Sequence, residues 1–183
     1  MADTLLLLGA FGVGKTTAIE AMQGRRLEID AAGDDATSTG PATETYTAEI
    51  APGTAVVLGE PARGTHLDRA WRVPADGALV LINHNAADRS SELERFLARL
   101  RGATEPTRPV VIGVTHLDQL PQLPLAVYDQ YIRQTNQGCN CPRCTPPVLG
   151  VDARVANDVR AALVTLSAVI EMARRYPQPA CRA

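Results

Sequence analysis

The fold is decided by the stretch Gly9-Ala10-Phe11-Gly12-Val13-Gly14-Lys15-Thr16, which fits the pattern G-x-x-x-x-G-K-[ST]. A strand-like apolar run, Thr4–Leu8, precedes this stretch, and a helix-forming segment, 17–22, follows it. Glycines allow such a turn to wrap with its backbone N–H groups pointing inward, and the start of the next helix adds partial positive charge. The stretch therefore predicts a strand, a phosphate-binding loop and a helix, in that order.

The lysine of this loop is the only lysine in the chain. Lysine and arginine together number 18, and all the others are arginines. A coding bias toward arginine explains the absence of lysine elsewhere, whereas a narrow phosphate pocket requires a slender, flexible ammonium group. We expect Lys15 to reach the β- and γ-phosphates of a nucleotide and the Thr16 hydroxyl to bind Mg²⁺. The expected nucleotide contacts of the loop are Gly9, Gly12, Val13, Gly14, Lys15, Thr16 and Thr17, and the alternative is an ordinary glycine-rich turn.

The size and composition of the chain predict one globular domain. The chain has 183 residues, of which 45% are hydrophobic and 21% charged, so whole-chain disorder, collagen and coiled coil are excluded. A net charge of −2 gives no electrostatic case for nucleic-acid binding. The apolar run 5–8 is too short for a signal peptide or a membrane span. We therefore expect a single domain, 1–183, that is cytoplasmic and does not insert directly into a membrane.

Apolar runs and helical stretches alternate along the chain. Near-continuous apolar strands separated by helices indicate a doubly wound α/β fold, with a mostly parallel sheet and helices on both faces. Two helices are expected from apolar residues on one face, the first around 93–100 and the second around 159–173. Ligands of such sheets bind at the carboxyl ends of the strands. The expected strands after the first are 44–50, 54–58, 77–82, 109–114 and 148–151, the first two of these joined as a hairpin at Pro52-Gly53.

A possible base-reading element follows the strand at 110–114. It reads Thr115-His116-Leu117-Asp118. A carboxylate at this place can accept hydrogen bonds from both N1–H and the N2 amino group of guanine, whereas adenine offers no such pair of donors. A buried carboxylate left without these donors would cost about 1–3 kcal/mol. The sequence therefore favours guanine.

These motifs together resemble the bacterial branch of the Ras-like small GTPases, the gliding-motility (MglA) type and especially the conservon-type GTP-binding proteins. The resemblance runs nearly end to end and includes Thr115, His116 and Asp118 as the guanine motif. It also includes Asp152-Ala153-Arg154, which looks like the loop whose Ala backbone N–H contacts guanine O6. The resemblance implies a six-stranded Ras-type sheet, GTP and GDP binding with Mg²⁺, and a switch role in motility, polarity or signalling. It further implies a roadblock-type (MglB-like) protein as partner and activator of hydrolysis.

The second switch region departs from that family. The family usually has small-x-Pro-Gly-Gln where this chain has Gly59-Glu60-Pro61-Ala62-Arg63. Ala62 restricts the backbone where a Gly N–H would sense the γ-phosphate, and Arg63 replaces the Gln that orients water. Gly59 cannot replace a Walker B type Asp, and the sequence does not establish that Glu60 does. Arg63 is either a cation that stabilises transition-state charge or an exposed, partner-contacting residue, and we expect slow GTP hydrolysis to GDP and phosphate.

The first switch should supply a threonine to Mg²⁺ and the γ-phosphate. Counting back from the strand at 54–58 favours Thr39, whereas the family's pattern of threonines before the strand favours Thr43. The alternative is that these threonines are solvated and the switch has degenerated.

Three of the four cysteines lie in a short loop at about 136–147. A Cys-x-Cys-x-x-Cys arrangement can bind Zn²⁺ when a distant fourth ligand joins it. Free thiols and a disulfide are the alternatives, and iron–sulfur ligation or a redox thiol pair are rarer options. The candidate ligands are Cys139, Cys141, Cys144 and Cys181.

The sequence thus favours a guanine-nucleotide switch. One rival is a nucleotide-holding scaffold or pseudo-GTPase that acts as an interaction module, which the altered Ala62-Arg63 region favours. A second rival is a small phosphotransferase, against which the placement of Asp118 and the lack of an arginine-rich lid both argue.

Overall fold

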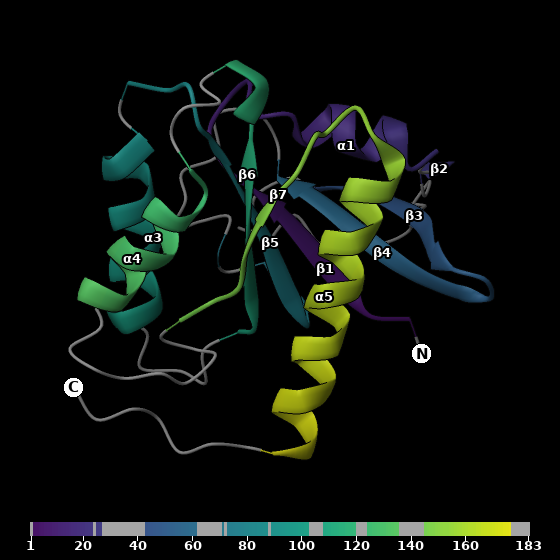
Figure 1. Ribbon diagram of the computed structural model, residues 1–183. Coiled ribbons are helices and arrows are strands. Elements are labelled where there is room, and N and C mark those ends of the chain that lie inside the picture. The colour runs from purple at the N-terminus through teal and green to yellow at the C-terminus, as the bar shows by residue number, and fades with distance from the viewer. Residues whose placement is uncertain are drawn as a thin grey trace, which may run out of the picture.

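The computed structural model describes residues 2–23, 25–26, 43–61, 71, 73–87, 89–102, 108–119, 124–135 and 145–176. Over these residues the structure is α/β, and four helices pack on a mostly parallel sheet (Figure 1). The strands are β1 (Thr4–Leu8), β2 (Arg25–Arg26), β3 (Thr43–Ala51), β4 (Thr54–Pro61), β5 (Gly77–Asn83), β6 (Val110–Thr115) and β7 (Val148–Gly150). The helices are α1 (Lys15–Ala21), α3 (Arg89–Gly102), α4 (Ala126–Thr135) and α5 (Ala156–Arg175), and a short 3-10 turn, η1 (Leu117–Gln119), follows β6.

Strand β1 lies inside the sheet, between two strands that come later in the chain. The strand order is β2-β3-β4-β1-β5-β6-β7, and β1 pairs in parallel with both β4 and β5. The chain leaving β1 therefore stands where the strand order reverses, which is the place where ligands bind in open α/β sheets. The stretches after β6 and β7 leave the sheet at the same edge, because β5, β6 and β7 are also parallel.

The hairpin expected at Pro52-Gly53 is present. Strands β3 and β4 pair antiparallel on either side of it. Gly53 has a φ of +73°, which a glycine adopts without strain, and its N–H donates to the Glu49 carboxylate at 2.8 Å. The hairpin brings the last residues of β4 back beside β1.

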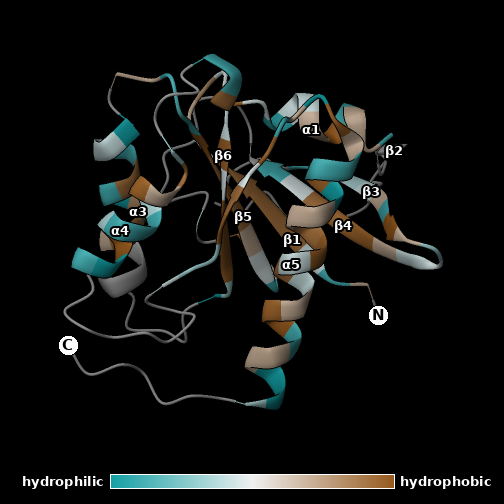
Figure 2. Ribbon diagram, in the orientation of Figure 1, coloured by the Kyte–Doolittle hydropathy of each residue, from teal (hydrophilic) through white to brown (hydrophobic). Residues whose placement is uncertain are grey.

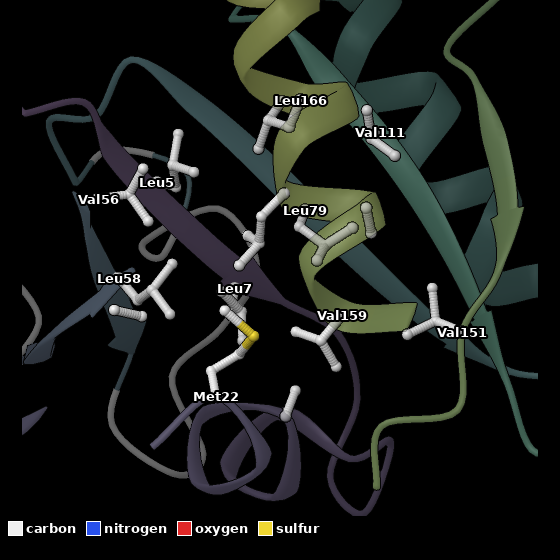
Figure 3. Close-up of a cluster of buried hydrophobic side chains, with 14 of the residues drawn as sticks. Leu5, Leu7, Met22, Val56, Leu58, Leu79, Val111, Val151, Val159 and Leu166 are labelled. Atoms are coloured by element: carbon white, nitrogen blue, oxygen red, sulfur yellow. The ribbon is translucent and has the colours of Figure 1, made fainter. Parts of the chain in front are cut away.

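Two apolar cores cover the two faces of the sheet. One face packs against α1 and α5, as the close-up in Figure 3 shows for Leu7, Met22, Val159 and Leu166. The other packs against α3 and α4 through residues such as Phe96. Figure 2 accordingly shows the central strands as the most apolar part of the structure. Full burial of one such side chain contributes about 1.5–3 kcal/mol, so the two cores account for most of the stabilising free energy.

Helix α5 connects the two edges of the sheet. Its first turn holds Asp158, close to the end of β7. Its last turn holds Arg174, whose guanidinium donates to Asp3 at 2.9 Å and to Asp76 at 2.7 Å. Because Asp3 precedes β1 and Asp76 precedes β5, these ion pairs fix the end of α5 at the amino edge of the sheet.

The six longer strands agree with the expected α/β sheet. The two-residue edge strand β2 and helix α4 were not predicted as separate elements. In α4 only Tyr128 and Ile132 are buried, so its apolar period is too short to be decisive in the sequence. Within the described residues, no helix combines the length and apolar character needed to cross a bilayer.

Candidate functional site

A cavity of about 560 Å³ lies at the carboxyl edge of the sheet. Three segments that are far apart in sequence line it: the loop after β1, the turn after β6, and the loop between β7 and α5 (Figure 1). Each was selected from the sequence as part of one nucleotide site. Its lining residues are Gly12, Gly14, Thr17, Thr115, His116, Leu117, Asp118, Gln119, Gly150, Val151, Asp152, Ala153, Arg154 and Asp158.

The glycines of the loop after β1, which the sequence predicts to be a phosphate loop, are required by its shape. Gly9 has a φ of +143°, and a Cβ there would collide with the backbone carbonyl oxygen of Leu81 in β5. Gly14 has a φ of +101°, and a Cβ there would lie 2.9 Å from the Cβ of Ala153. Side chains at these two positions are therefore excluded both by backbone strain and by space. The close approach of Gly14 to Ala153 also joins the phosphate loop to the loop after β7.

The lysine of the loop bends back over the loop's own backbone. Its Nζ donates to the carbonyl oxygens of Gly9 and Ala10, both at 3.1 Å. Lys15 does not line the cavity, nor do Gly9, Thr16 and the fully buried Val13. The ammonium group therefore lies against the backbone of the loop that the sequence predicts to bind phosphate.

Thr16 hydrogen-bonds with a carboxylate from the end of β4. Its hydroxyl lies 3.2 and 3.3 Å from the two carboxylate oxygens of Glu60, so the hydroxyl donates to that group. The parallel pairing of β4 with β1 places Glu60 beside the end of β1, because Gly59 is paired with Leu6. Glu60 thus lies beside Thr16. The sequence alone did not establish whether Glu60 takes the place of a Walker B type Asp. A hydroxyl and a carboxylate in contact are oxygen donors of the kind that Mg²⁺ prefers.

A buried carboxylate supports the opposite side of the phosphate loop. The N–H of Ala10 donates to Oε1 of Glu92 at 2.9 Å. Glu92 belongs to α3 and is only 8% exposed. This bond fixes the start of the loop to a helix 82 positions away in sequence.

Thr115 connects strand β6 with the phosphate loop. Its side chain is 1% exposed, and its hydroxyl lies 3.1 Å from the carbonyl oxygen of Val13 and 3.3 Å from that of Ile82. The same hydroxyl is 2.9 Å from Nδ1 of His116, whose φ is +59°. Thr115 therefore positions the loop, while His116 turns the chain sharply so that the following residues face the cavity.

Asp118 is joined to the loop after β7 by an arginine. Nη2 of Arg154 donates to Oδ2 of Asp118 at 3.2 Å. The same guanidinium donates two hydrogen bonds to Asp152, from Nε to Oδ1 at 2.8 Å and from Nη2 to Oδ2 at 2.7 Å. These hydrogen bonds from Arg154 lower the pKa of Asp152 to about 2 and raise the pKa of Arg154. One cation thus bridges two carboxylates at this end of the cavity.

The loop after β7 is held by the first turn of α5. The N–H of Asp152 donates to the carboxylate of Asp158 at 3.1 Å, and the N–H of Arg154 donates to Asp152 at 3.0 Å. A carboxylate in the first turn of a helix is also favoured by the helix dipole. Ala153 lies between these fixed points and lines the cavity.

Other predicted site residues lie outside the described part of the chain. They are Thr39, Arg63 and the four cysteines, Cys139, Cys141, Cys144 and Cys181. Thr43 begins β3, and its backbone pairs with Pro61. Among the described residues, no group of three or more His, Cys, Asp or Glu side chains is placed to hold a metal ion.

Seven residues of the site were not selected from the sequence. Five line the cavity, and the other two are carboxylates that contact the loop after β1 or the start of α1: Leu117, Gln119, Gly150, Val151 and Asp158, then Glu60 and Glu92. The contact of Glu60 with Thr16 depends on the parallel register of β1 and β4, which the sequence does not specify. Glu92 lies on a helix face with Leu93 and Phe96, and an acidic residue beside buried apolar residues is the one signal that could have identified it. Neither a protein-family model nor the sequence of a characterised protein matches this chain.

Proposed function

We propose that this protein is a guanine-nucleotide-binding molecular switch with a Ras-like P-loop fold, which binds GTP and GDP together with Mg²⁺. The observation that carries this proposal is that Gly12 and Gly14 of the phosphate loop line the same cavity as Asp118 and Ala153. A nucleotide needs both a place for its phosphates and a place for its base. The cavity offers both within about 560 Å³.

The phosphate end would be formed by the backbone of the loop. Left-handed Gly12 and Gly14 open the turn, and the N-terminus of α1 begins at Lys15. Backbone N–H groups at such a helix start favour negatively charged oxygens. Lys15, which rests on two loop carbonyl oxygens, would swing its ammonium group onto the terminal phosphates.

The base end would read guanine through Asp118. Its carboxylate lines the cavity beside Ala153, whose N–H would meet guanine O6. Adenine presents an amino donor in place of O6 and lacks the N1–H and N2 donors. Its binding would give neither the Asp118 carboxylate nor the Ala153 N–H the bonds that guanine offers, so discrimination is expected.

Mg²⁺ fits the pair formed by Thr16 and Glu60. Their oxygens are already in contact at 3.2 and 3.3 Å, and the pair adjoins the start of α1. Thr16 would give its hydroxyl oxygen to the metal, and Glu60 would hold that hydroxyl or a metal-bound water. Bound Mg²⁺ would neutralise negative charge on the phosphates.

Turnover is proposed to be slow or dependent on a partner. The Ala62-Arg63 sequence lacks the glycine and glutamine that sense the γ-phosphate and orient water, and it is also what favours the rival scaffold function. A roadblock-type partner and a cytoplasmic location belong to the same proposal. Single-turnover hydrolysis of GTP, with and without such a partner, separates the switch from the scaffold. A rate that stays near zero in both conditions favours the scaffold.

The decisive test is the identity of the bound nucleotide. The protein is denatured, released nucleotide is separated by chromatography, and the emptied protein is titrated with GDP, a GTP analogue and ADP in Mg²⁺. We expect selective binding of the two guanine nucleotides and its loss in Lys15→Ala. Equal affinity for ADP and GDP, or unchanged affinity in Lys15→Ala, would contradict the proposal.

A substitution at the base end gives a matched control. Asp118→Asn replaces one acceptor with a donor, and xanthine carries a carbonyl where guanine has its N2 amino group. The variant should therefore lose GDP and gain xanthosine diphosphate, with its fold unchanged. Such an exchange of preference would locate the base at Asp118 rather than elsewhere on the chain.

A further inference from the structure

The base end of the cavity already contains a group that resembles a guanine edge. The guanidinium of Arg154 presents N–H donors in one plane, as the N1–H and N2 amino groups of guanine do. One of these donors is within 3.2 Å of Oδ2 of Asp118. Arg154 therefore engages the carboxylate that, in the proposed function, reads the base.

We propose that Arg154 is an internal competitor for Asp118, which weakens the hold on guanine and speeds nucleotide release. This inference rests on the proposed function. The bond from Arg154 takes one of the two lone pairs of Oδ2, so guanine and the guanidinium would share the acceptor capacity of this oxygen, and entry of guanine would weaken the Arg154 bond. Departure of guanine restores it, and the restored bond lowers the free energy of the empty site relative to the filled one.

The contacts of Arg154 explain how it exchanges without leaving the site. Its bonds to Asp152, at 2.8 and 2.7 Å, are shorter than its bond to Asp118 at 3.2 Å. The guanidinium can give up Asp118 while Asp152 continues to hold it. The bond from the Asp152 N–H to the Asp158 carboxylate fixes the backbone of Asp152 to the first turn of α5. Arg154 can therefore stay bound to Asp152 while its guanidinium moves away from Asp118.

The exposure of the pair sets the size of the effect. The side chain of Arg154 is 66% exposed and that of Asp118 is 57% exposed. Exposed ion pairs are screened by water and contribute little, so the competition amounts to a few-fold change and does not block the site. Arg154 thus adjusts the lifetime of the bound nucleotide.

The test uses Arg154→Met, which keeps the aliphatic stem and removes the donors. Release of a fluorescent GDP analogue is followed by competition with excess GDP. We expect release from the variant to be about two- to five-fold slower than from the wild type. Arg160→Met is the matched control, because Arg160 carries the same charge on α5 but bonds to Asn157. Release from this control should be unchanged.

The salt dependence of guanosine affinity gives a second test. A merely structural role of Arg154 would not change this dependence. Guanosine, which has no phosphates, is titrated at about 0.1 M and about 1 M salt, where the screening length falls from roughly 10 to 3 Å. The difference in guanosine affinity between the wild type and Arg154→Met should shrink at high salt. Release from Arg154→Met that is as fast as from the wild type, or faster, would overturn the inference and leave the proposed function standing. If the wild type binds no GDP, the proposed function itself fails.

Discussion

The N–H of Ala10 donates to Oε1 of Glu92 at 2.9 Å and so fixes the phosphate loop to α3. Glu92 is 8% exposed, and its neighbours Leu93 and Phe96 belong to the core under α3. The other side of the loop is held by Thr115, which contacts the carbonyl oxygen of Val13. The loop is therefore held from both sides by the protein's own groups.

Replacing Glu92 should loosen the loop and destabilise the fold. Glu92→Ala leaves the Ala10 N–H without its carboxylate, and a hydrogen bond to a charged group contributes about 1.5–3 kcal/mol. We expect urea unfolding to show this loss and nucleotide affinity to fall with it. Glu92→Gln keeps an acceptor oxygen and should recover most of both.

A neighbouring acidic residue provides the control for Glu92. Glu94 is exposed on the same helix and bonds to the Tyr131 hydroxyl at 2.9 Å. Glu94→Ala should change the free energy of unfolding by less than about 1 kcal/mol. Equal losses in Glu92→Ala and Glu94→Ala would show that the bond to Ala10 is not what matters.

Acid should act on the base end through Asp152. Hydrogen bonds from Arg154 lower its pKa from 3.8 to about 2, so the folded state favours the ionised carboxylate. The stabilising contribution of Asp152 is therefore complete above about pH 4 and is lost as the pH falls from about 4 to about 2. A carboxyl ¹³C titration should place the midpoint near pH 2. In Arg154→Met the midpoint should return toward 3.8, and an unmoved midpoint would show that Arg154 is not the cause.

Gly14 should tolerate no side chain. In Gly14→Ala the new Cβ would stand 2.9 Å from the Cβ of Ala153 at a φ of +101°, where strain costs of order 1–3 kcal/mol. We expect Gly14→Ala to have lower thermal stability than the wild type and to lose more nucleotide affinity than Gly12→Ala, because the clash separates the two loops that line the cavity. Gly12→Ala meets nothing within 4 Å and should lose less stability. Equal effects in the two variants would argue against the contact with Ala153.

The cysteine loop is tested by metal analysis. If Cys139, Cys141, Cys144 and Cys181 bind Zn²⁺, protein purified without chelator should carry about one zinc ion per chain. Cys141→Ser should remove it, because a thiolate ligand is lost. Protein that contains neither zinc nor iron would leave free thiols or a disulfide as the alternatives.

Local patterns were sufficient to predict most of the fold. The phosphate loop, the hairpin at Pro52-Gly53 and the apolar strands each depend on neighbours in sequence, namely glycines, turn residues and continuous hydrophobic runs. Helix α4 was less evident because only two of its side chains are buried. The two-residue strand β2 pairs only with β3, and a pairing this short leaves no pattern in the sequence.

The site was predicted less completely than the fold. Its three segments were identified because each carries its own motif, and the parallel sheet brings them to one edge. Glu60, Glu92 and the bridge from Arg154 to Asp118 were not foreseen, because each contact depends on the spatial register of segments between 36 and 82 positions apart. Such contacts follow from packing rather than from local preference.

Helix α5 also has a mechanical consequence. Its 20 residues form a rod of about 30 Å, at 1.5 Å per residue. At one end, Asp158 accepts a hydrogen bond from the loop between β7 and α5. At the other end, Arg174 forms ion pairs with Asp3 and Asp76. A tilt of this helix at the cavity would therefore displace the residues that precede β1 and β5. A change at the carboxyl ends of the strands would in this way reach their amino ends.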